Sequence, residues 1–274
     1  MMTFRSHAIL TALTLIICPV VWAQPGNPDL PVYRRGGFSS MTAMGQTLYK
    51  GLSPKLQEQL HARPVSLVTD VMPYVHPEEV QYPDLPKPMR LVFISVGFVD
   101  LVNYVAHAKA IDRIEKGFFP NYVLKLSQET GDKELAELPK LADPKYWTDR
   151  MMNEQESNFS QMVGIVLAIE MSHHYLGHCQ KYADKLKDAK GQPVPVNKFL
   201  TPDEWEMSLK AGLRNALDRG YGVDGVLALY EAIEKMPQRP AWTVYFLPDW
   251  VKVAKLRKDL KRIEENFFAG RDVK

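Results

Sequence analysis

The segment from about residue 156 to residue 187 is predicted to form a long helix that is apolar on nearly all sides. Leu167, Ala168 and Met171 extend its apolar surface beyond a single face. Its main apolar face consists of residues at helical spacing, namely positions 159, 162, 163, 166, 169, 173 and 176, all of them apolar except His173. A helix that is apolar all round must be covered by other elements. We therefore expect it to lie at the centre of the fold.

Shorter elements precede and follow this helix. Residues 91–96 are an apolar run typical of a buried strand, and we expect it to end in a turn at Gly97. Residues 24–39 are expected to be extended, 72–89 to be loop, and 120–152 to be short pieces, because prolines, glycines and polar residues interrupt them. Helices are expected at 41–52, 53–62, 100–119, 201–222, 223–236 and 249–267. The predicted fold class is α+β, mostly helical, with a small sheet.

The composition limits the number of domains and the class of partner. The chain has 274 residues, of which 46% are hydrophobic and 24% are charged, which suits one globular domain or two at most. Its formal net charge is +2, and no dense basic patch is visible. We expect no nucleic-acid partner, because binding to nucleic acid depends on many basic side chains. Motifs of serine hydrolases and phosphate-binding loops are also absent from the sequence.

The first 23 residues have the pattern of a secretory signal peptide. A short basic start and an apolar run over residues 8–21 lead to Val21-Trp22-Ala23, and cleavage is expected after Ala23. An uncleaved membrane anchor is one alternative, although the run is short for a bilayer span of about 20 residues and contains Pro19. A lipoprotein attached through Cys18 is another alternative.

Cleavage would give a periplasmic or secreted protein. No second apolar stretch has the length of a membrane span, so we expect no stable membrane span after cleavage. Cys179 would be the one cysteine of the mature chain, which excludes an internal disulfide. The expected organisation is a signal peptide at 1–23, an N-terminal extension with helices at 24–60, and one domain at 61–270.

The long helix carries a near match to the zinc-binding pattern H-E-x-x-H. In that pattern two histidines four residues apart bind one zinc ion, and the glutamate acts as general base toward the bound water. Here the frame is Ile169-Glu170-Met171-Ser172-His173. The glutamate and the second histidine are present, but an isoleucine, which cannot bind a metal, stands at the first position.

This region resembles the HtpX-type and CAAX-prenyl-protease-type gluzincin peptidases, which include soluble periplasmic members. The segments that carry the resemblance, besides the motif, are VFISVGFVDLV at 92–102, HHYLGH at 173–178, DEWEMSLKAGLRNALDRGYGVDG at 203–225 and FLPDWVKVAKLRKDL at 246–260. The resemblance covers roughly residues 60–265. It implies a metallopeptidase-like domain with a zincin-like core, in which strand 91–96 forms the edge of a small sheet beside the motif helix. Residues 102–155 would be an insertion.

The resemblance also implies a ligand set. The family takes its third zinc ligand from a helix with the pattern E-x-x-x-D. The spacing of that pattern places the ligand at Glu204 in this chain. Glu206 is the alternative if the alignment of the helix is shifted by two residues. The chain departs from the family at Ile169 in place of a zinc ligand, at Ser208 in place of the supporting aspartate, and at Leu247 in place of a frequent histidine. Because polar site positions are lost while the framework is kept, the resemblance implies a degenerate zinc site.

The candidate residues of the motif helix also have structural interpretations. Glu170 is a general base or a buried carboxylate paired with a basic neighbour, and His173 is a metal ligand or a hydrogen-bonded core histidine. His174 and His178 are four residues apart, and with Glu170 they would bind a metal on another face; otherwise they lie on the more exposed side of the helix. Cys179 is a soft metal ligand or a packing residue.

The candidate third ligand has a structural interpretation as well. Thr201 and Glu204 fit a capping box, in which the glutamate at the third helical position bonds back to the amide of the N-cap residue. Trp205 and Trp242 are expected to be core residues.

Two functions are compatible with these features. The first is an exported metallopeptidase-like protein without catalysis, a pseudopeptidase that binds or scaffolds a protein or peptide partner. The alternative is an active zinc-dependent endopeptidase that uses His173 and Glu204 with His174 or His178 as a substitute ligand. A helical protein of another kind with a chance motif would explain the pattern too. Zinc binding is expected to be weak or absent, because catalytic zinc sites need three protein ligands.

Overall fold

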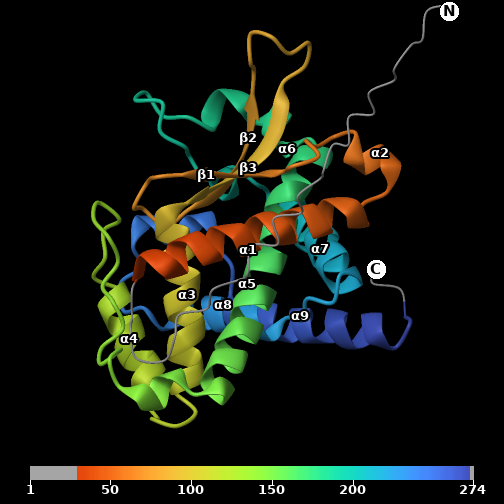
Figure 1. The fold of residues 1–274 in the computed structure, drawn as a ribbon. Coiled ribbons are helices and arrows are strands. Elements are labelled where there is room, and N and C mark those ends of the chain that lie inside the picture. Colours follow the sequence, from red (N-terminus) through yellow and green to blue (C-terminus); the bar gives the residue numbers. More distant parts are fainter. Residues whose placement is uncertain (1–29, 272–274) are drawn as a thin grey trace, which may run out of the picture.

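The computed structural model describes residues 30–271 (Figure 1). The fold is α+β and mostly helical, with one three-stranded sheet, as predicted. Among residues 30–271, no helix is both long enough and apolar enough to cross a membrane. The expected signal peptide lies outside the described residues.

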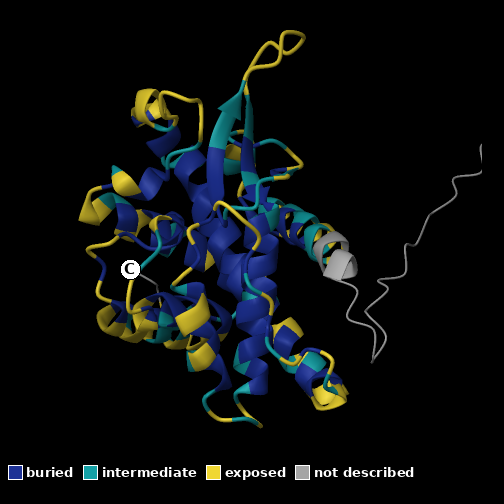
Figure 2. Ribbon diagram, turned by 90° about the vertical axis from the view of Figure 1, so that its left-hand side faces the viewer, coloured by how far each residue is buried: buried dark blue, intermediate teal, exposed yellow. Residues whose placement is uncertain are grey.

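The central helix is α5 (Asp149–Tyr175), and all its residues from 162 to 174 are buried (Figure 2). It packs against α1 (Leu30–Gly51), α3 (Val96–Ile111), α7 (Pro202–Asp218) and α8 (Asp224–Lys235). The prediction of a central helix is therefore confirmed, but its bounds were wrong. The helix ends twelve residues earlier than expected, because Gly177 adopts a φ of 79° in the left-handed region that often terminates helices. A short helix, α6 (His178–Lys181), follows.

The N-terminal segment differs from the prediction. Residues 30–39, which were expected to be extended, belong to α1. Gly37 is one of the glycines behind that expectation, but in the structure it permits a close contact: a Cβ at this position would lie 2.7 Å from Cγ1 of Val99 on α3. The helix is thus stabilised by its packing, which outweighs the low helix propensity of glycine. The next helix, α2 (Pro54–Gln57), is shorter than the predicted 53–62.

The sheet has the order β1-β3-β2, with β1 (Val65–Val68), β2 (Val75–Val80) and β3 (Met89–Ser95). β1 runs parallel and β2 antiparallel to β3. The strand expected at 91–96 is confirmed, but it is the central strand and not an edge. β2 lies in a segment that was expected to be loop. Its proline, Pro77, is tolerated because β2 is an edge strand.

The chain passes from β3 directly into α3, so the expected turn at Gly97 was wrong. The hydroxyl of Ser95 accepts a hydrogen bond from the backbone N–H of Phe98 (2.9 Å) and caps the helix. Gly97 is needed for packing, because a Cβ there would lie 2.0 Å from the carbonyl oxygen of Val71. α3 is buried along almost its whole length and, with α4 (Phe118–Leu126), contacts α8. The residues of α3 and α4 within the segment 102–155, which was expected to be an insertion, are thus largely packed in the hydrophobic core.

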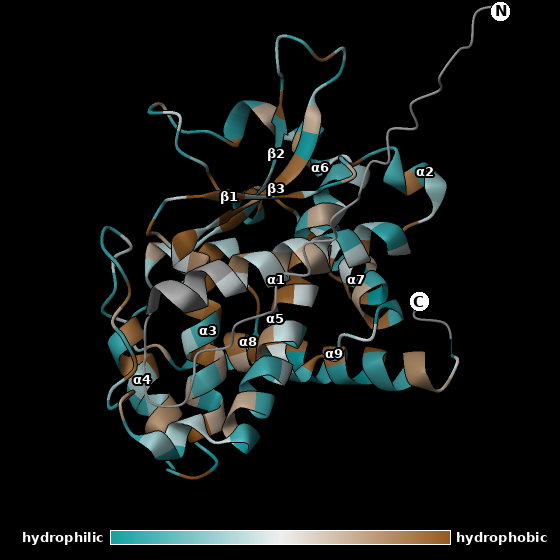
Figure 3. Ribbon diagram, viewed as in Figure 1, coloured by the Kyte–Doolittle hydropathy of each residue, from teal (hydrophilic) through white to brown (hydrophobic). Residues whose placement is uncertain are grey.

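The remaining helices agree closely with the predicted bounds. α7 and α8 begin and end within a few residues of the predictions, and α9 (Val253–Phe268) begins four residues later than expected. Short 3-10 turns occupy Pro144–Trp147, Ala183–Lys185, Val196–Lys198 and Ala241–Tyr245. Trp205 and Trp242 are buried as predicted, and Leu247 is also in the core. α9 is amphipathic, with Val253, Leu256, Leu260 and Ile263 buried, and it extends beside α7 and α8 (Figures 1 and 3).

Candidate functional site

The motif residues of α5 are all buried, and they contact different neighbours. Ile169 and His173 face α7, at Gly212 and Ser208 respectively. His174 faces the sheet, where its Nε2 donates to the carbonyl oxygen of Leu91 on β3 (2.9 Å). The motif helix α5 therefore lies beside strand β3 and beside helix α7. These are the segments that the resemblance implies as its neighbours.

Two imidazoles and one hydroxyl form a buried cluster. Nδ1 of His173 lies 3.0 Å from Nδ1 of His178, and Oγ of Ser208 lies 3.2 Å from each of these nitrogens. Because Oγ of Ser208 donates its hydrogen to the carbonyl oxygen of Glu204 (2.9 Å), it can only accept, and only from the ring whose Nδ1 carries a hydrogen. A hydrogen bond between two neutral imidazoles then requires that one Nδ1 carries a hydrogen and the other does not. We call His173, His178 and Ser208 the histidine–serine cluster.

Both rings of the cluster are neutral at neutral pH. Burial, followed by the charges of His178 and His174, holds the pKa of His173 well below its usual value. Burial also lowers the pKa of His178, although the carboxylate of Glu204 acts in the opposite direction. Nε2 of His173 is buried and has no hydrogen-bond partner within residues 30–271.

The break at Gly177 decides which residues meet. It ends the helix before His178, so His178 is not one helical turn beyond His174 but turns back toward His173. The alternative metal site of Glu170, His174 and His178 is therefore not assembled, and the two histidines are buried, not exposed. The sequence contained a signal for this helix end: Gly177 itself, four residues after His173, since glycine is common directly after a helix.

His174 has a structural role. Since a carbonyl oxygen accepts its hydrogen bond, the ring carries its hydrogen on Nε2. Burial lowers the pKa of His174 to about 4, and the hydrogen bond to Leu91 only partly counteracts this. The neutral ring thus ties α5 to the central strand of the sheet.

Glu170 is buried with a raised pKa. Burial alone places the pKa of Glu170 well above its usual value, and no basic side chain contributes. The pairing with a basic neighbour, which was one expectation, is thus not found among residues 30–271. Its titratable neighbours are instead Cys179, Tyr230 and Tyr245. A negative charge on Glu170 would raise the pKa of each of these three groups. Burial therefore favours the neutral carboxylic acid form of Glu170, and in that form it cannot accept a proton from water.

Glu204 caps its own helix, as its structural interpretation predicted. Its carboxylate accepts hydrogen bonds from the backbone N–H of Thr201 (2.9 Å), from Nζ of Lys181 (2.6 Å) and from the hydroxyl of Tyr182 (2.8 Å). Burial would raise the pKa of Glu204, but the hydrogen bonds outweigh it and lower the pKa to about 2. Glu206, the alternative ligand, points to solvent and pairs with Lys210 (2.8 Å). Neither carboxylate bonds to His173.

These side chains do not fit a catalytic zinc ion, which needs three protein ligands. In the described part of the chain, no three side chains of the types His, Cys, Asp and Glu are close enough to hold a metal ion. Ile169 takes the place of the first ligand and packs tightly: a Cβ at Gly212 would lie 2.6 Å from its backbone nitrogen. Cys179 is buried, and burial raises the pKa of its thiol, which is consistent with a packing role.

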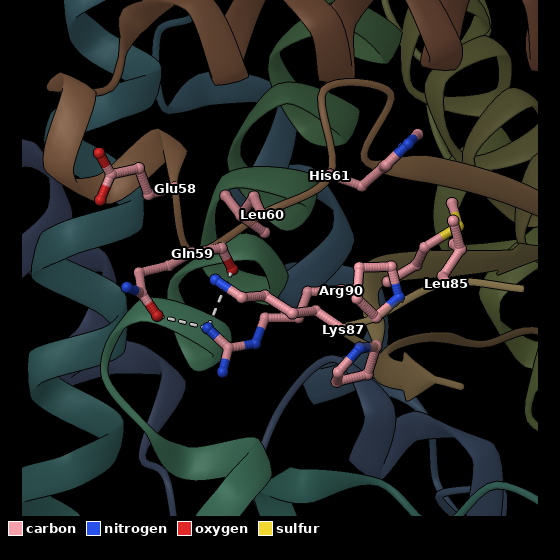
Figure 4. A pocket seen from close by; sticks show the side chains of 10 residues that line it. Glu58, Gln59, Leu60, His61, Leu85, Lys87 and Arg90 are labelled. Atoms are coloured by element: carbon pink, nitrogen blue, oxygen red, sulfur yellow. Dashed lines mark hydrogen bonds between the residues drawn. The ribbon is translucent and has the colours of Figure 1, made fainter. Parts of the chain in front are cut away.

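A hollow of about 570 Å³ lies on the sheet side of the molecule, where the loop between β2 and β3 meets the segment after α2. Figure 4 shows Arg90 in this hollow, bonded to Gln59. The guanidinium of Arg90 is also paired with Glu79 (2.9 Å). None of the candidate residues predicted from the sequence lines this hollow.

The chain matches no family model, no curated protein and no solved structure in the comparisons. The fold and the site are therefore interpreted from their own geometry.

The capping box leads to a first testable prediction. Thr201→Ala removes the hydroxyl that accepts from the backbone N–H of Glu204, and it should lower the free energy of unfolding by about 1 kcal/mol in urea denaturation. Thr47→Ala is the control, because the hydroxyl of Thr47 is exposed and bonds only within its own helix. Equal stability of the Thr201→Ala variant and the wild type would contradict a capping role.

Proposed function

We propose that this protein is a gluzincin-related, metallopeptidase-like protein whose zinc site has degenerated. It acts as an exported, non-catalytic binding or scaffolding protein for a protein or peptide partner. The observation that carries this proposal is the histidine–serine cluster: His173, the one motif histidine in place, bonds to His178 and Ser208, neither of which belongs to the H-E-x-x-H pattern.

Two further observations support the loss of catalysis. Ile169 stands at the first ligand position and packs against Gly212, so a ligand there would require rearrangement of both helices. Burial shifts Glu170, which the motif would use as general base, toward its neutral form, because it raises the pKa of this carboxyl well above its usual value. The arrangement of α5 between β3 and α7 supports the relation to the gluzincins, because the resemblance implies those neighbours.

One observation favours the alternative, an active zinc-dependent endopeptidase. His173 and His178 approach each other closely, and Glu204 lies near enough to influence the pKa of His178. These three side chains would be the ligand set of such an enzyme. Glu204 would first have to leave Lys181 and Tyr182, which bind it in the structure.

The experiment that tests the proposal measures zinc content and proteolysis on the mature chain. After dialysis against zinc buffer, the purified protein should contain far less than one zinc ion per chain, and it should not cleave casein. Its melting temperature should not change when a chelator is added, because a ligand stabilises a protein only if it binds the folded state.

The matched variants are Glu204→Gln and Glu170→Gln. Under the proposal neither variant changes the zinc content. One zinc ion per chain, with chelator-sensitive cleavage that both variants lose, would establish the active enzyme and reject the pseudopeptidase.

A further inference from the structure

A groove of about 550 Å³ lies between α7 and α9, away from the histidine–serine cluster. Its floor is apolar and contains the buried side chains of Trp205, Leu209 and Leu256. Trp250, in the loop before α9, forms one wall. The two helices make few contacts with each other, and the groove follows the line between them.

Trp250, which forms the aromatic wall of the groove, is unusually exposed for a tryptophan. Trp250 is 48% exposed, which is far above the other tryptophans of the described chain. It is held in place by Trp205, whose ring lies 5.8 Å away between centroids at an interplanar angle of 78°. An exposed aromatic residue that packs on a second ring above a buried apolar floor is typical of a position that anchors an apolar side chain of a partner.

The charged rim of the groove is predominantly basic. Four cations and two carboxylates line it, namely Lys210, Lys252, Lys255, Arg262, Glu206 and Asp259. Both carboxylates already have partners: Glu206 pairs with Lys210 (2.8 Å), and Asp259 pairs with Arg262 (3.1 Å) and Lys255 (3.4 Å). Lys252 makes no ion pair within residues 30–271, so the rim has a surplus of positive charge.

We propose that this groove binds an acidic peptide segment that carries one large apolar side chain. The apolar side chain lies against Trp250 and the floor, and the carboxylates of the segment face Lys252 and the other basic residues of the rim. This charge complementarity selects an acidic partner over a basic one. The inference does not rest on the proposed loss of zinc, because none of His173, His178 and Ser208 lines the groove.

The test measures binding by fluorescence anisotropy with dye-labelled peptides. The probe is a short peptide of glutamates with one central phenylalanine, and the matched probes replace the glutamates by lysines or the phenylalanine by glycine. The acidic phenylalanine peptide should bind, the two matched probes should bind much more weakly, and added salt should weaken the binding.

Three variants of the protein locate the binding site. Trp250→Ala should weaken binding of the acidic peptide about thirtyfold, the effect of a central aromatic anchor. Lys252→Glu should weaken it about fivefold, the effect of one exposed ion pair. Lys258→Glu makes the same charge change on α9 outside the groove and should have less than about a twofold effect, because exposed charges at a distance are screened.

The two substitutions in the groove affect exposed side chains, so a folded variant is expected in each case, and circular dichroism checks it. The inference is overturned if the acidic peptide does not bind, if the lysine peptide binds equally well, or if Lys252→Glu and Lys258→Glu have equal effects.

Discussion

Gly212→Ala is expected to lower the free energy of unfolding by about 3 kcal/mol, the upper range for overpacking in a core. A Cβ at Gly212 would lie 2.6 Å from the backbone nitrogen and 2.7 Å from the Cα of Ile169. The obstacle is backbone, which cannot rotate away as a side chain can, so α5 and α7 would have to separate. The measurement is urea denaturation followed by circular dichroism.

Gly36→Ala is the matched control for this prediction. Gly36 is also in a helix, but a Cβ there would have no atom within 4 Å. Alanine should stabilise the protein at this position by up to about 1 kcal/mol, because glycine has a low helix propensity. If both variants gained stability, the tight contact between Gly212 and Ile169 would be refuted, and there would be room for a ligand at position 169.

Glu170→Gln is expected to make the protein more stable at neutral pH, by an amount that grows with pH. Glutamine has the same shape as the neutral acid but releases no proton. The pKa of Glu170 is about 4.5 in an unfolded chain and is raised well above this value by burial in the folded protein. Above pH 4.5 the unfolded wild type releases this proton while the folded wild type keeps it. The wild type therefore loses about 1.4 kcal/mol per pH unit until the folded pKa is reached.

The difference in unfolding free energy between Glu170→Gln and the wild type should be smallest at and below pH 4.5, and it should increase with pH until the raised pKa of the folded protein is reached. The buried histidines act in the opposite direction. Their pKa values are lowered, so the stability that they contribute above about pH 6.5 is lost as the pH falls, equally in both proteins. Glu206→Gln is the control, because that carboxyl is exposed and its pKa is lowered. A difference that does not depend on pH would show that Glu170 is ionised in the folded protein.

Local signals in the sequence were enough to predict most helices and the central strand. The apolar surface of α5, the N-cap at Thr201 and the apolar run of β3 are properties of consecutive residues. β1 and β2 could not be predicted in this way, because each is stabilised by pairing with β3, which is distant in sequence. The helix over residues 30–39 was also missed because a distant contact is involved. Gly37 fits into this helix because it packs closely against Val99, which is distant in sequence.

The candidate site was predicted only in part. The sequence placed Ile169 and His173 on one face of a helix, and the structure agrees. It also offered both interpretations of Glu204, and the capping interpretation is the one that the structure adopts. The pairing of His173 with His178 was not predicted, because it depends on the left-handed residue Gly177, which reverses the chain after α5.

The hairpin of β2 and β3 has a consequence for local unfolding. The loop between the strands projects from the body and is exposed at residues 81–88 (Figures 1 and 2). The ladder next to it, from Val80 paired with Met89 to Glu79 paired with Arg90, contains no fully buried side chain, and burial begins at Leu91. The tip of the hairpin can therefore open without exposing the core, at the cost of a few hydrogen bonds and the Arg90–Glu79 ion pair. Such opening stops at Leu91, where the hydrogen bond from His174 attaches the strand to the central helix α5.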